Sequence, residues 1–137
     1  MDTNTPWAMI IGFFCAGLVY LLGGVDELIR SLTIFMTIDI LLGVMVAFSN
    51  GEVDSHKTFK GLLKKTAMIL MIIVAVQVDL VTNSGNFMRN SMILFLIGME
   101  GISIVENLGK LGVPVPMFIV NAFSKLQEDN DEKKEEK

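Results

Sequence analysis

Residues 28–48 read LIRSLTIFMTIDILLGVMVAF, and this run decides the fold. A helix over these residues would be about 31 Å long at 1.5 Å per residue, which is close to the hydrocarbon thickness of a bilayer. The apolar residues form an almost unbroken block rather than the alternation typical of a half-buried strand. The run therefore predicts a helix that crosses a membrane.

Three further apolar blocks lie on either side of this run. The four predicted spans cover residues 7–25, 28–48, 66–81 and 88–105. A secretory signal peptide begins with a positively charged segment, but no Lys or Arg precedes the first block. Trp7 at the start of the block is typical of an interfacial anchor. We therefore expect a retained span there, with a three-span form as the alternative. The sequence predicts an all-α integral membrane protein with about four transmembrane helices.

Composition supports the same class. Of the 137 residues, 52% are hydrophobic and only 19% are charged, which is too little charge to cover the surface of a soluble domain. With one Cys and one His, the chain lacks the groupings that form disulfides, metal sites or common catalytic centres. We predict no enzymatic activity, no cofactor and no metal. No basic field indicates nucleic acid as a partner.

Charge in the connection between the second and third spans predicts the orientation. This connection carries Lys57, Lys60, Lys64 and Lys65, whereas the other two connections carry one arginine each. The positive-inside rule places such a loop in the cytoplasm, so four spans would leave both termini cytoplasmic. The four lysines are predicted to lie at the membrane surface and to attract anionic lipid headgroups.

The same loop is predicted to contain a short interfacial helix. Phe59, Leu62 and Leu63 follow helical spacing, and the lysines lie on a broadly different side. An ordinary basic flank of a span is the alternative, and both can hold together.

The C-terminal part is predicted to leave the bilayer. After two prolines, residues 117–127 form an amphipathic pattern, expected to lie on the membrane or to dock on a partner helix. Residues 128–137 are almost all charged and predict a disordered, soluble tail. We expect residues 1–127 to form a single membrane domain.

Four polar residues interrupt the apolar blocks. Asp39 and Glu100 lie near the centres of the second and fourth spans, and Gln77 and Asp79 lie towards the outer end of the third. Because no Lys or Arg is expected at matching depth, we predict that protonated carboxyls form interhelical hydrogen bonds, or that these side chains face water in an oligomer. A pore-lining face and polar contacts inside a compact bundle stay open as equal alternatives.

Small residues recur every fourth position in the first two spans, which lets helix backbones approach closely. Their spacing does not separate folding of one chain from assembly of many. The positions are Ala8, Gly12 and Ala16 in the first span, and Gly43 and Ala47 in the second.

Two motifs extend this interpretation. Residues 39–79 read DILLGVMVAFSNGEVDSHKTFKGLLKKTAMILMIIVAVQVD, with an Asp before Leu-Leu-Gly, a Ser-containing loop, a Lys-rich entry to the next helix and an Asp at its end. Residues 100–116 read EGISIVENLGKLGVPVP. In this order they resemble the phage lysis and toxin-secretion holin family of Gram-positive bacteria and their phages.

The resemblance implies a protein that accumulates in the host cytoplasmic membrane and assembles with copies of itself. The assemblies would form lesions that release an endolysin or another large protein cargo. The endolysin would not need to contact this chain directly. The resemblance assigns no role to Asp39 or Glu100. The residues alone are equally compatible with a small ion-conducting channel, or with an antiholin or accessory membrane protein.

Overall fold

The computed structural model describes residues 6–51 and 54–135, with side chains described through residue 128. Within these residues the chain forms five α-helices and no strand, which confirms the all-helical prediction. The helices are α1 (Pro6–Leu21), α2 (Glu27–Ser49), α3 (Ser55–Thr82), α4 (Phe87–Lys110) and α5 (Met117–Glu135).

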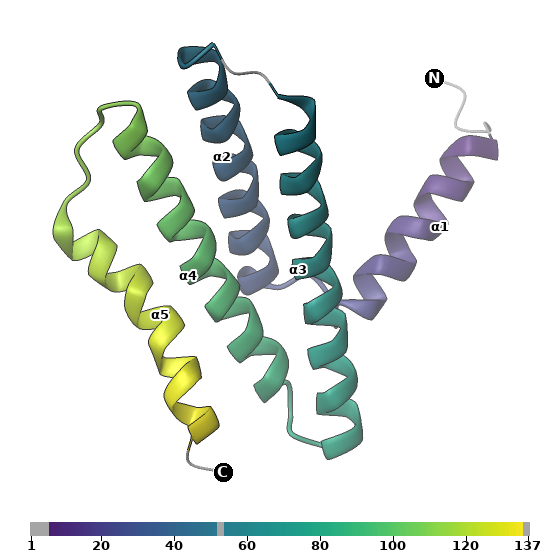
Figure 1. Cartoon of the computed structure of the whole chain (residues 1–137). Coiled ribbons are helices and arrows are strands. Elements are labelled where there is room, and N and C mark those ends of the chain that lie inside the picture. The colour runs from purple at the N-terminus through teal and green to yellow at the C-terminus, as the bar shows by residue number, and fades with distance from the viewer. Residues whose placement is uncertain (1–5, 52–53, 136–137) are drawn as a thin grey trace.

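Helix α4 is the centre of the bundle. α2 and α3 both pack against it, and α5 runs back along its other side (Figure 1). α1 projects away from the bundle and has no buried residue. The connections α2–α3 and α4–α5 lie at one end of the bundle, and the connection α3–α4 lies at the other (Figure 1).

The core is small and apolar, and it comes from the inner faces of α2, α3 and α4. The outer faces carry many exposed large apolar side chains, which is the pattern expected when lipid, not water, covers them. The fully packed core consists of Ile29, Leu32, Met68, Ile72, Ile93, Leu96 and Ile97.

Three helices, α2, α3 and α4, are long and apolar enough to cross a membrane. α1 is also apolar but has only 16 residues, or about 24 Å of helix. The described part of the chain therefore contains three to four candidate spans, in agreement with the coarse prediction.

Helix α3 is longer than predicted. Instead of a short loop helix followed by a separate span, one helix of 28 residues runs from Ser55 to Thr82. It begins where the Asp54 carboxylate accepts a hydrogen bond from the backbone N–H of His56 at 2.8 Å. No proline follows within the helix, so nothing divides the basic segment from the apolar one.

Two helix ends also differ from the prediction. α1 ends at Leu21 rather than near residue 25, because Gly23 and Gly24 adopt positive φ values of 76° and 96° that an α-helix cannot accommodate. α5 continues to Glu135, where a disordered tail was predicted from residue 128. Glu and Lys are good helix formers, which favours continuation of the helix into the charged segment. Residues 136–137 lie outside the described residues.

Candidate functional site

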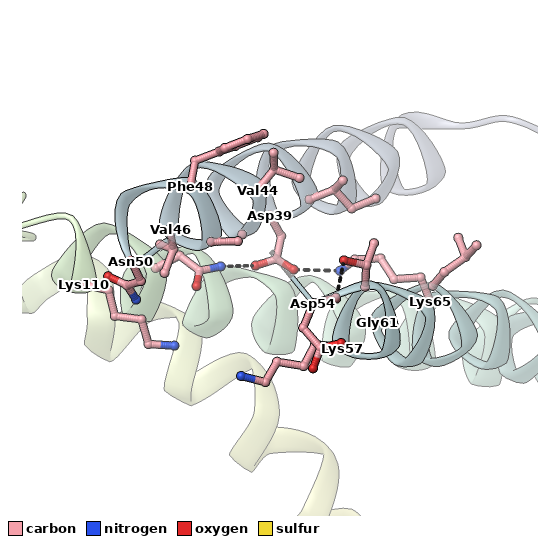
Figure 2. A pocket seen from close by; sticks show the side chains of 16 residues that line it. Asp39, Val44, Val46, Phe48, Asn50, Asp54, Lys57, Gly61, Lys65 and Lys110 are labelled. Atoms are coloured by element: carbon pink, nitrogen blue, oxygen red, sulfur yellow. Dashed lines mark hydrogen bonds and ion pairs between the residues drawn. The ribbon is translucent and has the colours of Figure 1, made fainter. Parts of the chain in front are cut away.

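A buried ion cluster joins three helices at the level of the predicted midplane acids. The Lys65 ammonium on α3 lies 2.9 Å from the Asp39 carboxylate on α2, and it also donates to the Glu100 carboxylate on α4. The side chains of Lys65 and Asp39 are each 13% exposed, and that of Glu100 is 2% exposed. Figure 2 shows Asp39 and Lys65 linked across the gap between their helices.

Asn107 completes this cluster. Its side-chain amide donates to the second oxygen of Asp39 at 3.0 Å. We call Asp39, Lys65, Glu100 and Asn107 the Lys65 cluster. Its interactions connect side chains only, and they join positions 26, 35 and 68 residues apart in the chain. Three helices are thus joined by interactions between side chains.

The Lys65 cluster corrects one prediction. A cation does lie beside Asp39 and Glu100, because Lys65 pairs with both. The predicted span began at residue 66, which placed Lys65 outside it. Because α3 is continuous from Ser55, Lys65 lies well inside the helix and reaches both acids. The ion pairs replace the predicted contacts between protonated carboxyls.

A second cluster lies at the end of the bundle where α3 meets α4. The Arg89 guanidinium is buried, with 2% of its side chain exposed. It donates to the backbone oxygens of Leu22 at 2.6 Å and Gly24 at 3.1 Å, and to the Asp26 carboxylate at 2.6 Å. The Arg89 hydrogen bond holds the pKa of Asp26 below its ordinary value. Arg89 therefore fastens the α1–α2 connection to the start of α4.

Asp79 belongs to this second cluster. Its carboxylate accepts hydrogen bonds from the backbone N–H groups of Met88 at 2.9 Å and Arg89 at 2.7 Å, and from the Ser84 hydroxyl. The N–H groups of Met88 and Arg89 belong to the first turn of α4, where backbone N–H groups have no partner within the helix. Asp79 thus caps α4 from the end of α3. Arg89, Asp79, Asp26 and Ser84 form what we call the Arg89 cluster.

The two clusters lie at different depths. Along α3, Lys65 is about 21 Å from Asp79, and along α4, Glu100 is about 17 Å from Arg89. If the Arg89 cluster marks one boundary of a hydrocarbon layer about 30 Å thick, the Lys65 cluster lies just past its middle. Gln77, the remaining predicted polar residue, is exposed on α3 and belongs to neither cluster as described.

The small residues divide into two groups. Ala8, Gly12 and Ala16 are exposed on α1, and a Cβ added at Gly12 would meet no atom within 4 Å. In the single chain this stripe lies on an exposed face of α1. Gly43 and Ala47 instead line a cavity of about 560 Å³ between α2 and α3 (Figure 2).

α4 and α5 approach each other closely at glycines that were not predicted as packing residues. A Cβ at Gly101 of α4 would lie only 2.4 Å from the Phe123 ring of α5, and one at Gly98 would lie 2.9 Å from the Phe123 backbone oxygen. The Phe123 ring also packs edge-on against Phe35, at 5.6 Å between centroids. The spacing of Gly98 and Gly101 on one helix face was the available signal. α5 therefore docks on α4, one of the two predicted alternatives.

The basic segment of α3 is also divided. Lys57 lines the cavity between α2 and α3, together with Lys110 from the end of α4. Lys60 and Lys64 are exposed and do not line it. Within the part of the chain that the structure describes, no group of His, Cys, Asp and Glu side chains could hold a metal ion.

Comparisons with known proteins give the family. Residues 16–128 match the model of the bacteriophage holin family. The chain is 34% identical over 116 residues to a probable holin of Bacillus phage phi105, covering 85% of each chain. It is 35% identical over 117 residues to an uncharacterised protein of Listeria innocua, covering 83% of this chain and 84% of the relative.

A third relative is an uncharacterised protein of Clostridium perfringens, 35% identical over 113 residues, with 82% of this chain and 84% of the relative covered. No solved structure matches the chain. The family consists of non-enzymatic membrane proteins, as the sequence analysis predicted. The matched region includes α2, α3 and α4 in full, and with them both ion clusters. This chain therefore belongs to the bacteriophage holin family.

Proposed function

We propose that this chain acts as a holin, accumulating in the cytoplasmic membrane and assembling into lesions that release an endolysin or another large protein. The observation that carries the proposal is the family match over residues 16–128, which includes all three long candidate spans. A relative of matching length is described as a probable holin.

The Lys65 cluster suggests how one sequence can serve both insertion and lesion formation. In the single chain, Asp39 and Glu100 share one lysine, so one of their two formal negative charges is balanced and both carboxylates are largely covered by protein. In an assembly, the same side chains can turn towards a water-filled lumen, where separated charges are solvated. A ring of such chains would have a polar inner face.

The proposed topology places the N-terminus and the α2–α3 connection in the cytoplasm. The sequence also predicted a cytoplasmic C-terminus, but α5 runs back along α4, so the C-terminal end of α5 lies at the opposite end of the bundle from the α2–α3 connection (Figure 1). Lys57, Lys60 and Lys64 would then lie near anionic headgroups of the inner leaflet. In a Cys15→Ser background, a cysteine replacing Thr82 should react with an impermeant maleimide from outside, and one replacing Thr58 should not. The reverse pattern would contradict this orientation.

Assembly is proposed to involve several copies of the chain. Cys15 is exposed on α1, beside the stripe of Ala8, Gly12 and Ala16. If α1 helices meet in the assembly, mild oxidation of membranes should yield a disulfide-linked dimer, and Cys15→Ser should abolish it. An unrelated membrane protein with one exposed cysteine serves as the control for random collision. A dimer yield equal to that of the control would argue against contact between α1 helices.

Inducible expression in a bacterial host tests the function itself. A holin should halt growth abruptly after a delay and release a co-expressed endolysin, so that the culture lyses. Endolysin alone and this chain alone are the matched controls, and neither should lyse the culture. An ion-conducting channel would depolarise the membrane without releasing protein, and an antiholin would only delay lysis caused by a partner. Either result would overturn the proposal.

A further inference from the structure

The outer surface of the bundle is apolar on one side and polar on the other. Exposed large apolar side chains are numerous on α2 and α3, whereas among the described residues α4 carries only Phe87 and Leu94. α5 covers the other side of α4 (Figure 1). The α2 and α3 side is thus suited to lipid, and the α5 side to water. Beyond the first turn of α5, the exposed side chains through residue 128 are small or polar, namely Asn121, Ala122, Lys125 and Glu128.

The contacts between α4 and α5 set the depth of each α5 residue. A Cβ added at Gly98 would lie 3.0 Å from the Cβ of Leu126, and one added at Gly101 would lie 2.4 Å from the Phe123 ring. The two helices therefore run antiparallel, and each later residue of α5 lies opposite an earlier residue of α4. Continued to Glu135, where α5 ends, this register brings the end of α5 about level with the Arg89 cluster.

The last part of α5 carries charge into the apolar depth of the bundle. Residues 128–135 read EDNDEKKE, and all of them except Asn130 are charged. In this register the segment lies alongside the part of α4 between Gly98 and the Arg89 cluster, about 14 Å of helix. If the Arg89 cluster marks one boundary of the hydrocarbon layer, the whole segment lies within that layer. Charged side chains at this depth face protein or water, so a docked α5 requires water on its outer side.

We propose that, in the membrane assembly, the α5 side of each bundle faces the aqueous lumen and the outer faces of α2 and α3 face lipid. α5 would then line the lesion. The competing arrangement is an α5 that leaves α4 and lies on the cytoplasmic membrane surface. It would give up the contacts of Phe123 with Gly101 and with Phe35. The proposal rests on lesion formation, and it does not depend on whether the Lys65 cluster opens.

A pair of spin labels tests whether α5 stays on α4 in a membrane. In a Cys15→Ser background, the full chain carries labels at Leu94→Cys and Glu128→Cys and is reconstituted in lipid vesicles with an excess of unlabelled chain. A docked α5 keeps the labels within about 15 Å, because packed helix axes are 8–10 Å apart, so the spectrum should be broadened. An α5 on the membrane surface would separate them by more than about 20 Å. An unbroadened spectrum would overturn the proposal.

Two single labels at similar depth then test which side faces water. Lys125→Cys places a label on α5 about level with Glu100, and Leu41→Cys places one on α2, two residues after Asp39. Both positions are exposed. The label at residue 125 should collide with a water-soluble nickel chelate severalfold more often than the label at residue 41, which should collide mainly with oxygen dissolved in lipid. Equal collision rates at the two positions would contradict the proposed lumen side.

Release of an encapsulated fluorescent protein from the same vesicles separates this proposal from the proposed function. Vesicles that release no cargo would overturn lesion formation and the lumen with it. Release together with a lipid-exposed label at residue 125 would overturn only the assignment of α5.

A glycine variant links docking to release. Gly101→Ala adds a Cβ that overlaps the Phe123 ring, so it should displace α5 and remove both the broadening and the release. Combining Gly101→Ala with Phe123→Ala removes the overlap and should recover part of both. Release that persists at the parent's level while α5 is displaced would show that α5 does not line the lesion.

Discussion

The Arg89 cluster and the Lys65 cluster both bury charge, but they are built differently. Arg89 and Asp79 bind mainly to backbone groups, namely the carbonyls of one connection and the first N–H groups of α4. Lys65, Asp39 and Glu100 bind only to other side chains. Backbone partners are fixed by the fold, whereas side-chain partners can be exchanged by rotation. The Arg89 cluster thus fixes one connection and one helix start, whereas the Lys65 cluster joins three helices through side chains alone.

Removing the shared cation should have the largest effect. Lys65→Met leaves Asp39 and Glu100 buried side by side, and breaking a buried pair in this way costs about 3–5 kcal/mol. Unfolding in detergent, followed by circular dichroism, measures the loss. Lys64→Met, at the exposed neighbouring position, should change the free energy of unfolding by less than about 0.5 kcal/mol.

Neutralising the whole cluster provides the internal check. Combining Lys65→Met with Asp39→Asn and Glu100→Gln should recover most of the lost stability, because no uncompensated charge remains. If the triple variant is as unstable as Lys65→Met alone, the loss comes from packing and not from charge.

Arg89→Met should have the next largest effect, about 1–3 kcal/mol. It leaves the carbonyls of Leu22 and Gly24 without their donor, whereas Asp26 is 48% exposed and can be hydrated. Proteolysis within residues 22–26 should accelerate. Arg89→Lys keeps the charge but not the planar fork, so it should lie between the parent and Arg89→Met. If Arg89→Lys protects residues 22–26 from proteolysis as well as the parent does, a positive charge at position 89 is sufficient to hold this connection.

Asp39→Asn should be milder than either of these changes. Lys65 keeps its contact with Glu100, and the new amide can still bond to Asn107, so we expect a loss of about 1 kcal/mol. The same variant should lyse cells with altered timing if the cluster rearranges during assembly. Stability and the delay before lysis are compared at equal membrane abundance. A loss as large as that of Lys65→Met would mean that Glu100 cannot hold the lysine alone.

The smallest effect should be a pH dependence at Asp26. Its folded-state pKa is lowered from 3.8, first by the Arg89 hydrogen bond, so the contribution to stability is present above about pH 3.8 and is lost as pH falls through the folded pKa. Protease protection of residues 22–26 should therefore decline in acid below that value. Asp26→Asn should remove this dependence, while a decline that persists unchanged in Asp26→Asn would assign it to another group.

Local signals in the sequence located most helices. Apolar runs and capping residues act over a few positions, so the ranges predicted for the second and fourth spans lie within α2 and α4. The same local reading divided α3 in two, because hydropathy changes near residue 66 although the backbone does not. It also missed Gly98 and Gly101, whose importance depends on Phe123, which lies in another helix.

The sequence by itself determined the all-helical class, the apolar candidate spans, the presence of acids within them and the resemblance to the holin family. Only the tertiary structure decided that Lys65 lies between Asp39 and Glu100, that Arg89 holds the α1–α2 connection, and that α5 covers the glycines of α4. The physical reason is the separation along the chain over which each interaction acts. Helix formation follows from neighbours within about one turn, whereas these contacts join distant positions and depend on how each helix is rotated and shifted against the next.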